Sequence, residues 1–128
     1  MLKLAVAALT QTATIVSGRI AQPVFRAYTG NDLVLHFTVV DDAGDPVDIS
    51  GWTTRNFALY TMDSGTAVFT KTPAFVTDGT DGEFTVTITD SDTSSLDAGN
   101  HRIEVQATGS GIKTTPVRGI IAFSKTYS

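Results

Sequence analysis

The chain has 128 residues, of which 41% are hydrophobic, and this is enough for one domain with a sizeable apolar core. It contains no cysteine, which excludes disulfides and sulfur-ligated zinc and leaves the redox compartment undetermined. The net charge is −4 and the nine basic residues are scattered, so we expect no nucleic-acid-binding surface.

The first 22 residues carry apolar side chains and no clear turn that would fold them back. These side chains are Leu2, Leu4, Val6, Leu9, Ile15, Val16 and Ile20, accompanied by the charges of Lys3 and Arg19. An exposed apolar set of this kind usually marks an interface. Fully extended, such a segment reaches roughly 70 Å, enough to cross to a neighbouring subunit.

We therefore expect residues 1–22 to form an N-terminal arm and residues 23–128 to form the folded domain. The seven apolar residues of the arm would bind a partner by strand addition. The pattern leaves open the alternative that residues 12–20 add an edge strand to the chain's own sheet. The apolar run is far shorter than the roughly 20 residues that span a bilayer, so no membrane contact is expected.

Short segments of alternating apolar residues follow Pro23. Residues 33–40 place leucine, phenylalanine and valine on one face and a partly apolar set on the other, which predicts a central strand. The segment 41–52 holds four aspartates, two glycines and a proline, which favours a tight turn before the chain re-enters at Trp52. Phe57 and Leu59 predict the next strand, and residues 66–72 a weaker one whose inward face stays open.

The second half contains the clearest strand, residues 83–89, with Phe84, Val86 and Ile88 on one side and polar residues on the other. Residues 90–96 offer capping oxygens before a single apolar anchor, which predicts one short helical turn. Two further strands are expected, one with Ile103, Val105 and Ala107 facing inward, and a last one through Ile121 and Phe123.

About seven strands with frequent turn signals predict an all-β fold, an immunoglobulin-like antiparallel β-sandwich with an extended N-terminal arm. The cysteine pair of antibody domains is missing. A jelly roll is the alternative, because strand counting does not separate the two topologies.

The sequence offers no constellation typical of catalysis or metal binding. His36 and His101 have no partner at ligand spacing. Ser94 and Ser95 lie near Asp97 and His101, but no nucleophile elbow presents a hydroxyl. The aspartate clusters lack the ligand spacing of a calcium loop and are interpreted as turn formers. Core packing explains Phe57, Phe84 and Phe123 better than a sugar-stacking platform does. We expect no enzyme, no cofactor and no metal site.

Four segments of the chain resemble the β-sandwich modules of tailed-bacteriophage baseplate upper proteins and of related head or tail accessory proteins. They are Gly30-Asn31-Asp32-Leu33, Asp42-Ala43-Gly44-Asp45-Pro46-Val47-Asp48-Ile49-Ser50-Gly51, Asp78-Gly79-Thr80-Asp81-Gly82 with the strand after it, and Leu96-Asp97-Ala98-Gly99-Asn100-His101-Arg102-Ile103-Glu104-Val105. The resemblance covers about residues 24–123 and departs at His101, where such modules more often carry tyrosine. It carries over no catalytic residue.

The resemblance implies a structural protein of the virion, assembled in the host cytoplasm. Together with the apolar arm it favours a capsid decoration or cement protein, a homo-oligomer and preferably a trimer, that clasps the major capsid protein. The alternative is a tail or baseplate adaptor that docks on a tail or baseplate protein. A carbohydrate-binding module and a hydrolase are less favoured, since one needs an exposed aromatic platform and the other a polar cleft.

Overall fold

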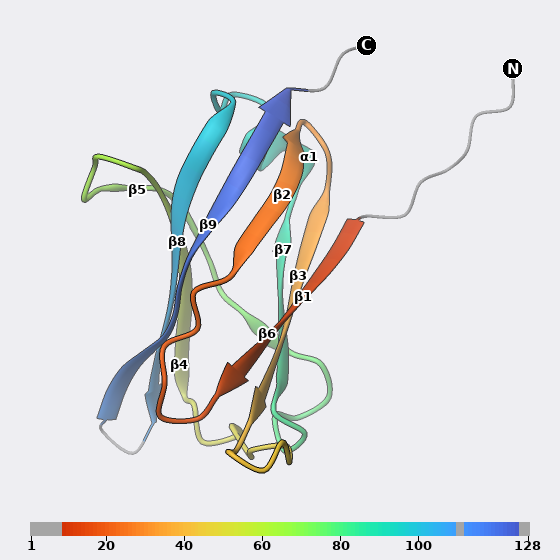
Figure 1. Ribbon diagram of the computed structural model, residues 1–128, viewed down its shortest axis with the longest axis vertical. Coiled ribbons are helices and arrows are strands. Elements are labelled where there is room, and N and C mark those ends of the chain that lie inside the picture. Colours follow the sequence, from red (N-terminus) through yellow and green to blue (C-terminus); the bar gives the residue numbers. More distant parts are fainter. Residues whose placement is uncertain (1–8, 110–111, 126–128) are drawn as a thin grey trace, which may run out of the picture.

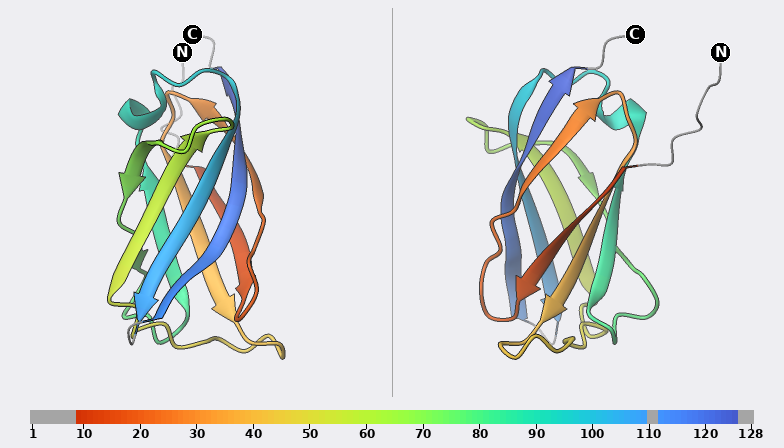
Figure 2. Two further views of the ribbon diagram at one scale, coloured as in Figure 1. Left: turned by 90° about the vertical axis from the view of Figure 1, so that its left-hand side faces the viewer. Right: turned by 45° about the vertical axis from the view of Figure 1, so that its right-hand side comes forward.

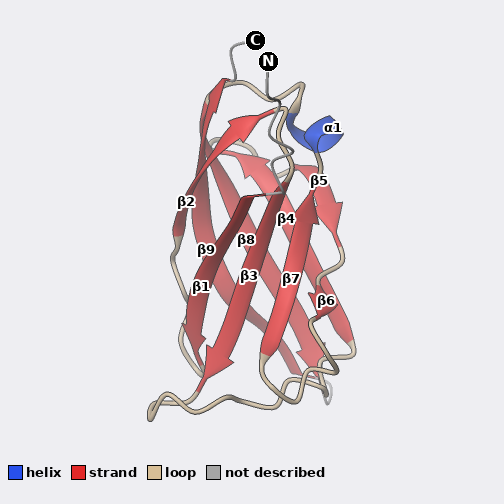
Figure 3. Ribbon diagram, turned by 90° about the vertical axis from the view of Figure 1, so that its right-hand side faces the viewer, coloured by secondary structure: helices blue, strands red, loops and turns tan. Residues whose placement is uncertain are grey.

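The structure, a computed structural model, describes residues 9–109 and 112–125, which form two β-sheets packed face to face (Figure 1). The four-stranded sheet has the order β1 (Leu9–Val16), β3 (Leu33–Val40), β7 (Glu83–Ile88) and β6 (Ala74–Phe75). The five-stranded sheet has the order β2 (Val24–Thr29), β9 (Ile112–Lys125), β8 (Gly99–Gly109), β4 (Thr54–Thr61) and β5 (Ala67–Lys71). Figure 3 shows the first sheet in front of the second. The prediction of an all-β sandwich is confirmed.

Two strand pairs are parallel, β1 with β3 and β2 with β9, whereas the sequence led us to expect antiparallel pairing throughout. The reason is that the chain changes sheets twice near its start. β1 descends in one sheet, a turn at Gly18 (φ 84°) sends β2 upward in the other, and a turn at Gly30 (φ 81°) returns β3 to the first. Each crossing reverses direction, so β1 and β3 run the same way. Glycine suits both turns because a positive φ costs it little.

The expected N-terminal arm is corrected for residues 9–16. These residues are β1, which pairs with β3 in register from Leu9 opposite Leu33 to Val16 opposite Val40. Ile15 is only 1% exposed and belongs to the core. This segment is therefore an edge strand of the chain's own sheet, which is the alternative that the sequence left open for residues 12–20. Residues 1–8 lie outside the described residues, and for them the arm stays a prediction.

Aromatic side chains fill the centre of the sandwich. Phe37 of β3 and Phe84 of β7 stack with ring centroids 5.0 Å apart, and Phe25 of β2 meets Phe37 edge-on at 5.9 Å. The alternation expected for β3, β7 and β8 is confirmed, because their inward residues are buried at every second position. In β5, Phe69 is the residue that packs against the core, which decides the face that the sequence left open.

One short helix, α1 (Asp90–Thr93), connects β7 to β8 where the sequence predicts a helical turn. Asp92 accepts a hydrogen bond from the Thr89 amide (2.8 Å) and pairs with Lys71 of β5 (2.7 Å), and Leu96 is buried behind the helix. In the part of the chain that the structure describes, no helix is long and apolar enough to cross a membrane.

Candidate functional site

The seven residues predicted to bind a partner do not form one surface. Leu2, Leu4 and Val6 lie outside the described residues. Leu9 opens β1, and the partly exposed Val16 closes it. Ile15 faces the chain's own core, which makes it unavailable to a partner, whereas Ile20 in the β1–β2 connection is 52% exposed. Among the members whose side-chain exposure the structure describes, namely Ile15, Val16 and Ile20, it is Ile20 that presents a large apolar surface.

Gln11 joins the two sheets at the edge where β1 and β2 lie. Its side-chain Nε2 donates to the carbonyl oxygen of Arg26, and its Oε1 accepts a hydrogen bond from the Arg26 amide at 3.2 Å. The side-chain amide thus pairs with the backbone of β2 as a neighbouring strand would. An unpaired edge is a template for strand addition, so Gln11 removes one pairing position from this edge.

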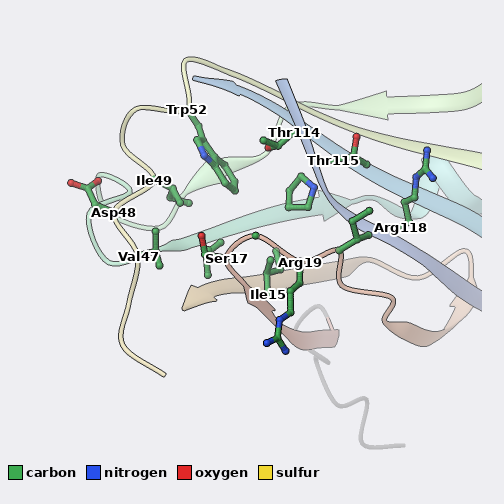
Figure 4. A pocket seen from close by; sticks show the side chains of 14 residues that line it. Ile15, Ser17, Arg19, Val47, Asp48, Ile49, Trp52, Thr114, Thr115 and Arg118 are labelled. Atoms are coloured by element: carbon green, nitrogen blue, oxygen red, sulfur yellow. The ribbon is translucent and has the colours of Figure 1, made fainter. Parts of the chain in front are cut away.

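A cavity of about 540 Å³ opens at one end of the sandwich, between the β1–β2 connection and the start of β9 (Figure 4). Its apolar lining includes the nearly inaccessible side chains of Ile15, Val39 and Ile49, together with Trp52. Two arginines also line the cavity, but both are already paired. Arg19 lies 3.4 Å from Asp42, and Arg118 lies 3.0 Å from Glu104. The cavity can accept an apolar side chain, and its lining holds no imidazole that would activate a hydroxyl.

The two histidines lie in different sheets and in different surroundings. His36 is on the outer face of the four-stranded sheet, where its Nε2 lies 2.9 Å from a carboxylate oxygen of Glu83, out of line for a hydrogen bond. His101 is buried in β8, with its ring edge-on to Phe123 at 5.4 Å and Nδ1 3.4 Å from the carbonyl oxygen of Gly99. Ser94 bonds the carbonyl oxygen of Ser91 instead of approaching His101.

Asp41, Asp48, Asp78 and Asp81 shape turns at the end of the sandwich drawn at the bottom of Figure 1, and for these four the prediction of turn formers is confirmed. Asp41 Oδ1 accepts the amides of Ala43 (2.9 Å) and Asp45 (3.0 Å). The hydroxyl of Ser50, then its amide, holds the pKa of Asp48 below its usual value. Thr80 lowers the pKa of Asp78 in the same way. A carboxylate that accepts such bonds is more easily ionised.

The end of the sandwich that is drawn at the bottom of Figure 1 is acidic. The β3–β4 connection brings Asp41, Asp42, Asp45 and Asp48 to this end, and the connection into β7 adds Asp78 and Asp81 (Figure 1). We call these six residues the aspartate end. Among the described residues, no group of three or more histidine, cysteine, aspartate or glutamate side chains is arranged to hold a metal ion.

The outer face of the five-stranded sheet has the opposite character, which the sequence reasoning missed. Three arginines point outward from β2, β8 and β9, beside exposed apolar side chains on the same strands. The arginine face consists of Val24, Arg26, Tyr28, Arg102, Arg118 and Ile120. Glu104 is the one acidic residue of these three strands, and it is paired with Arg118. The left panel of Figure 2 looks onto this sheet.

The arginine face is hollowed next to the β1–β2 connection. The hollow has a volume of about 510 Å³ and lies among Val24, Ile120 and Met62, with Arg102 and Arg118 beside them. Arg102 is held in place by the carbonyl oxygens of Thr61 and Ser64, and its guanidinium lies 4.8 Å from the centre of the Tyr60 ring. In residues 24–29, Val24, Arg26 and Tyr28 alternate with residues that the structure shows to be buried.

Comparisons with known proteins identify the fold. No protein-family model matches the sequence, and no curated protein matches it. Among the solved structures, the chain is similar to the N-terminal domain of phage TP901-1 ORF48, with a TM-score of 0.56 and 12% sequence identity. The similarity covers 91% of this chain and 99% of that domain. At this level of identity the two proteins share the sandwich fold.

Proposed function

We propose that this chain is a non-enzymatic structural module of a bacteriophage particle. The observation that carries the proposal is the match of nearly the whole sandwich to nearly the whole of a domain from a phage protein. The turn and strand segments that resemble phage β-sandwich modules support the same assignment from the sequence. Because fold alone does not determine function, the proposal also depends on what the surfaces offer.

Several of the described side chains that could perform chemistry are engaged in structural contacts. Asp41 and Asp78 close turns, and His101 packs against Phe123. Phe37, Phe57 and Phe84 are fully buried, so none of these three offers a platform for sugar stacking. The exposed features are an apolar and basic sheet face and an acidic end, which suit contacts between subunits. This supports a module that assembles with other proteins.

Within the particle, we favour a position in the tail or baseplate, where the module docks on a tail or baseplate protein. The sequence favoured the head because it indicated a free apolar arm over residues 1–22. Residues 9–16 are instead a strand of the sandwich, and Ile15 is buried in it. Residues 9–16 are therefore not free to clasp a neighbour on the shell. The resemblance to baseplate upper modules does not depend on the arm and remains.

The second candidate is a capsid decoration protein that binds the major capsid protein, preferably as a trimer. It keeps the support of residues 1–8, whose apolar side chains the sequence assigns to a partner. Both candidates make the chain a virion component.

Counting copies in purified particles tests both positions. Quantitative mass spectrometry should find about six to a few dozen copies if the module belongs to a tail or baseplate, as expected for rings of low symmetry. Hundreds of copies would instead assign it to the shell. Absence from particles, with the chain present in the infected cell, would overturn the virion role itself.

A further inference from the structure

We propose that the arginine face binds the aspartate end of a second copy of this chain. The contact would be head to tail, because the two surfaces lie on different sides of the same molecule. Contacts of this type generate rings when the rotation closes. The inference concerns self-association and goes beyond the proposed function, whose test by copy number does not depend on it.

The arginine face carries an exposed apolar surface. Val24 is 65% exposed and Tyr28 is 54% exposed, on the outer side of a strand whose alternate residues are buried. Met62 is a third exposed apolar residue, and it lines the same hollow as Val24. Apolar side chains gathered beside a hollow and rimmed by charge are the usual mark of a protein contact.

The charge of the arginine face favours an acidic partner. The chain as a whole carries a net charge of −4, yet the arginine face carries three arginines with one acidic neighbour. Arg26 is exposed, and the described contacts of this residue are made by its backbone, so its guanidinium is available. Complementary charge raises the rate of association and fixes orientation. A partner for this face must therefore be acidic.

The chain itself presents such a surface. Five of the six side chains of the aspartate end are exposed, namely Asp41, Asp42, Asp45, Asp48 and Asp78, and of these Asp42 is paired with Arg19. Asp41, Asp48 and Asp78 use Oδ1 for the turns, and their described hydrogen bonds leave Oδ2 available. Aspartates are ionised at neutral pH, and the lowered pKa of Asp48 and of Asp78 extends the ionisation of both to lower pH. Val76, which is also exposed, precedes this end and offers an apolar group.

The dimensions indicate a weak, reversible contact. Five strands about 4.8 Å apart, with about nine residues each on average at 3.3 Å per residue, give a flat face of roughly 20 by 30 Å. This is smaller than the roughly 800 Å² per partner of a stable complex. We expect a dissociation constant of roughly 10 to 100 µM for one contact, so that association becomes strong where many copies are held together.

Sedimentation velocity of the full chain tests the proposal, using samples from about 10 µM to about 1 mM to bracket that affinity. The mass should rise above the 13.5 kDa monomer with concentration, and high salt should reverse the rise by screening the charges. A chain that stays monomeric over this range at low salt would overturn the proposal.

Charge reversal identifies the two surfaces. Arg26→Glu changes the face, and Asp45→Lys changes the aspartate end without removing a described side-chain bond. Each variant alone should associate at least tenfold more weakly. Thr87→Glu, which adds a glutamate at an exposed position on the outer face of the other sheet, is the control and should behave as the unmodified chain.

The decisive sample is a mixture of the Arg26→Glu and Asp45→Lys variants. In a head-to-tail contact, the arginine face of the Arg26→Glu variant, now carrying a glutamate, meets the aspartate end of the Asp45→Lys variant, now carrying a lysine. Mixing the two variants should therefore restore association. Failure of the mixture to associate, or unchanged association of either single variant, would overturn the assignment of these two surfaces. Circular dichroism of each variant confirms that the sandwich is folded.

Discussion

Replacing Ile15 with alanine is expected to destabilise the sandwich by about 3 kcal/mol. Ile15 is 1% exposed, and the substitution removes three buried carbon groups, which at about 0.8 kcal/mol each amounts to about 2.4 kcal/mol. A cavity term adds to this loss, but it should be small because the residue already borders the cavity at the end of the sandwich. The loss therefore lies near the lower part of the usual range of 2 to 5 kcal/mol for such truncations.

Urea unfolding followed by Trp52 fluorescence measures this loss of stability. Trp52 is the only tryptophan, and its ring centroid lies 5.8 Å from that of Phe84 in the core. With a denaturant slope of ~1.5 kcal/mol per molar urea, the midpoint should fall by about 2 M. Ile20→Ala is the matched control, because Ile20 is 52% exposed and its truncation should cost less than about 0.5 kcal/mol. Equal midpoints for the two variants would show that β1 is not held by its own sandwich.

Three other changes probe the structure through the same unfolding measurement. Gln11→Ala removes the two hydrogen bonds to the Arg26 backbone and should lower the free energy of unfolding by about 1 kcal/mol. Hydrogen exchange at the Arg26 amide should become faster, and an unchanged exchange rate would contradict the pairing. Gly119→Ala places a Cβ 2.4 Å from the carbonyl oxygen of Pro23 and should cost about 1 to 3 kcal/mol, whereas Gly65→Ala, with open space around it, should cost nothing. Acidification should lower stability as the pH falls below the unfolded aspartate pKa of about 3.9, because the unfolded chain protonates Asp48 and Asp78 before the folded chain does. The double variant Asp48→Asn, Asp78→Asn should lose less stability over this pH range than the unmodified chain does. An equally steep loss of stability in the double variant would show that these two carboxylates are not its cause.

The strands that the sequence predicted well are those whose burial is decided locally. Phe84, Val86 and Ile88 alternate with polar residues, and this pattern alone fixes the strand and its inward face. Residues 11–15 carry a weaker signal, because Gln11 and Ala13 share the inward side with Ile15. An alternating pattern of apolar residues shows that one side of a strand is buried. It does not show whether that side is buried by the same chain or by another molecule. The placement of β1 required the tertiary structure.

The arginine face could not be predicted for a related reason. Arg26, Arg102 and Arg118 are far apart in the sequence, and each appears as an isolated basic residue in a strand. They meet because β9 pairs with β2 on one side and with β8 on the other. The aspartate end, in contrast, was visible from the sequence, since its residues are grouped in two turns.

The pairing of β2 with β9 has a consequence for biosynthesis. Phe25 lies opposite Ile121, so β2 finds its neighbour only after residues 112–125 have been made. Until then β2 has no strand beside it, and Phe25 has no complete core to enter. Closure of the five-stranded sheet must therefore wait until β9 has left the ribosome, and contacts between residues so distant along the chain are slow to form. Nascent chains that stop before β9 would expose the edge that β9 covers in the finished molecule.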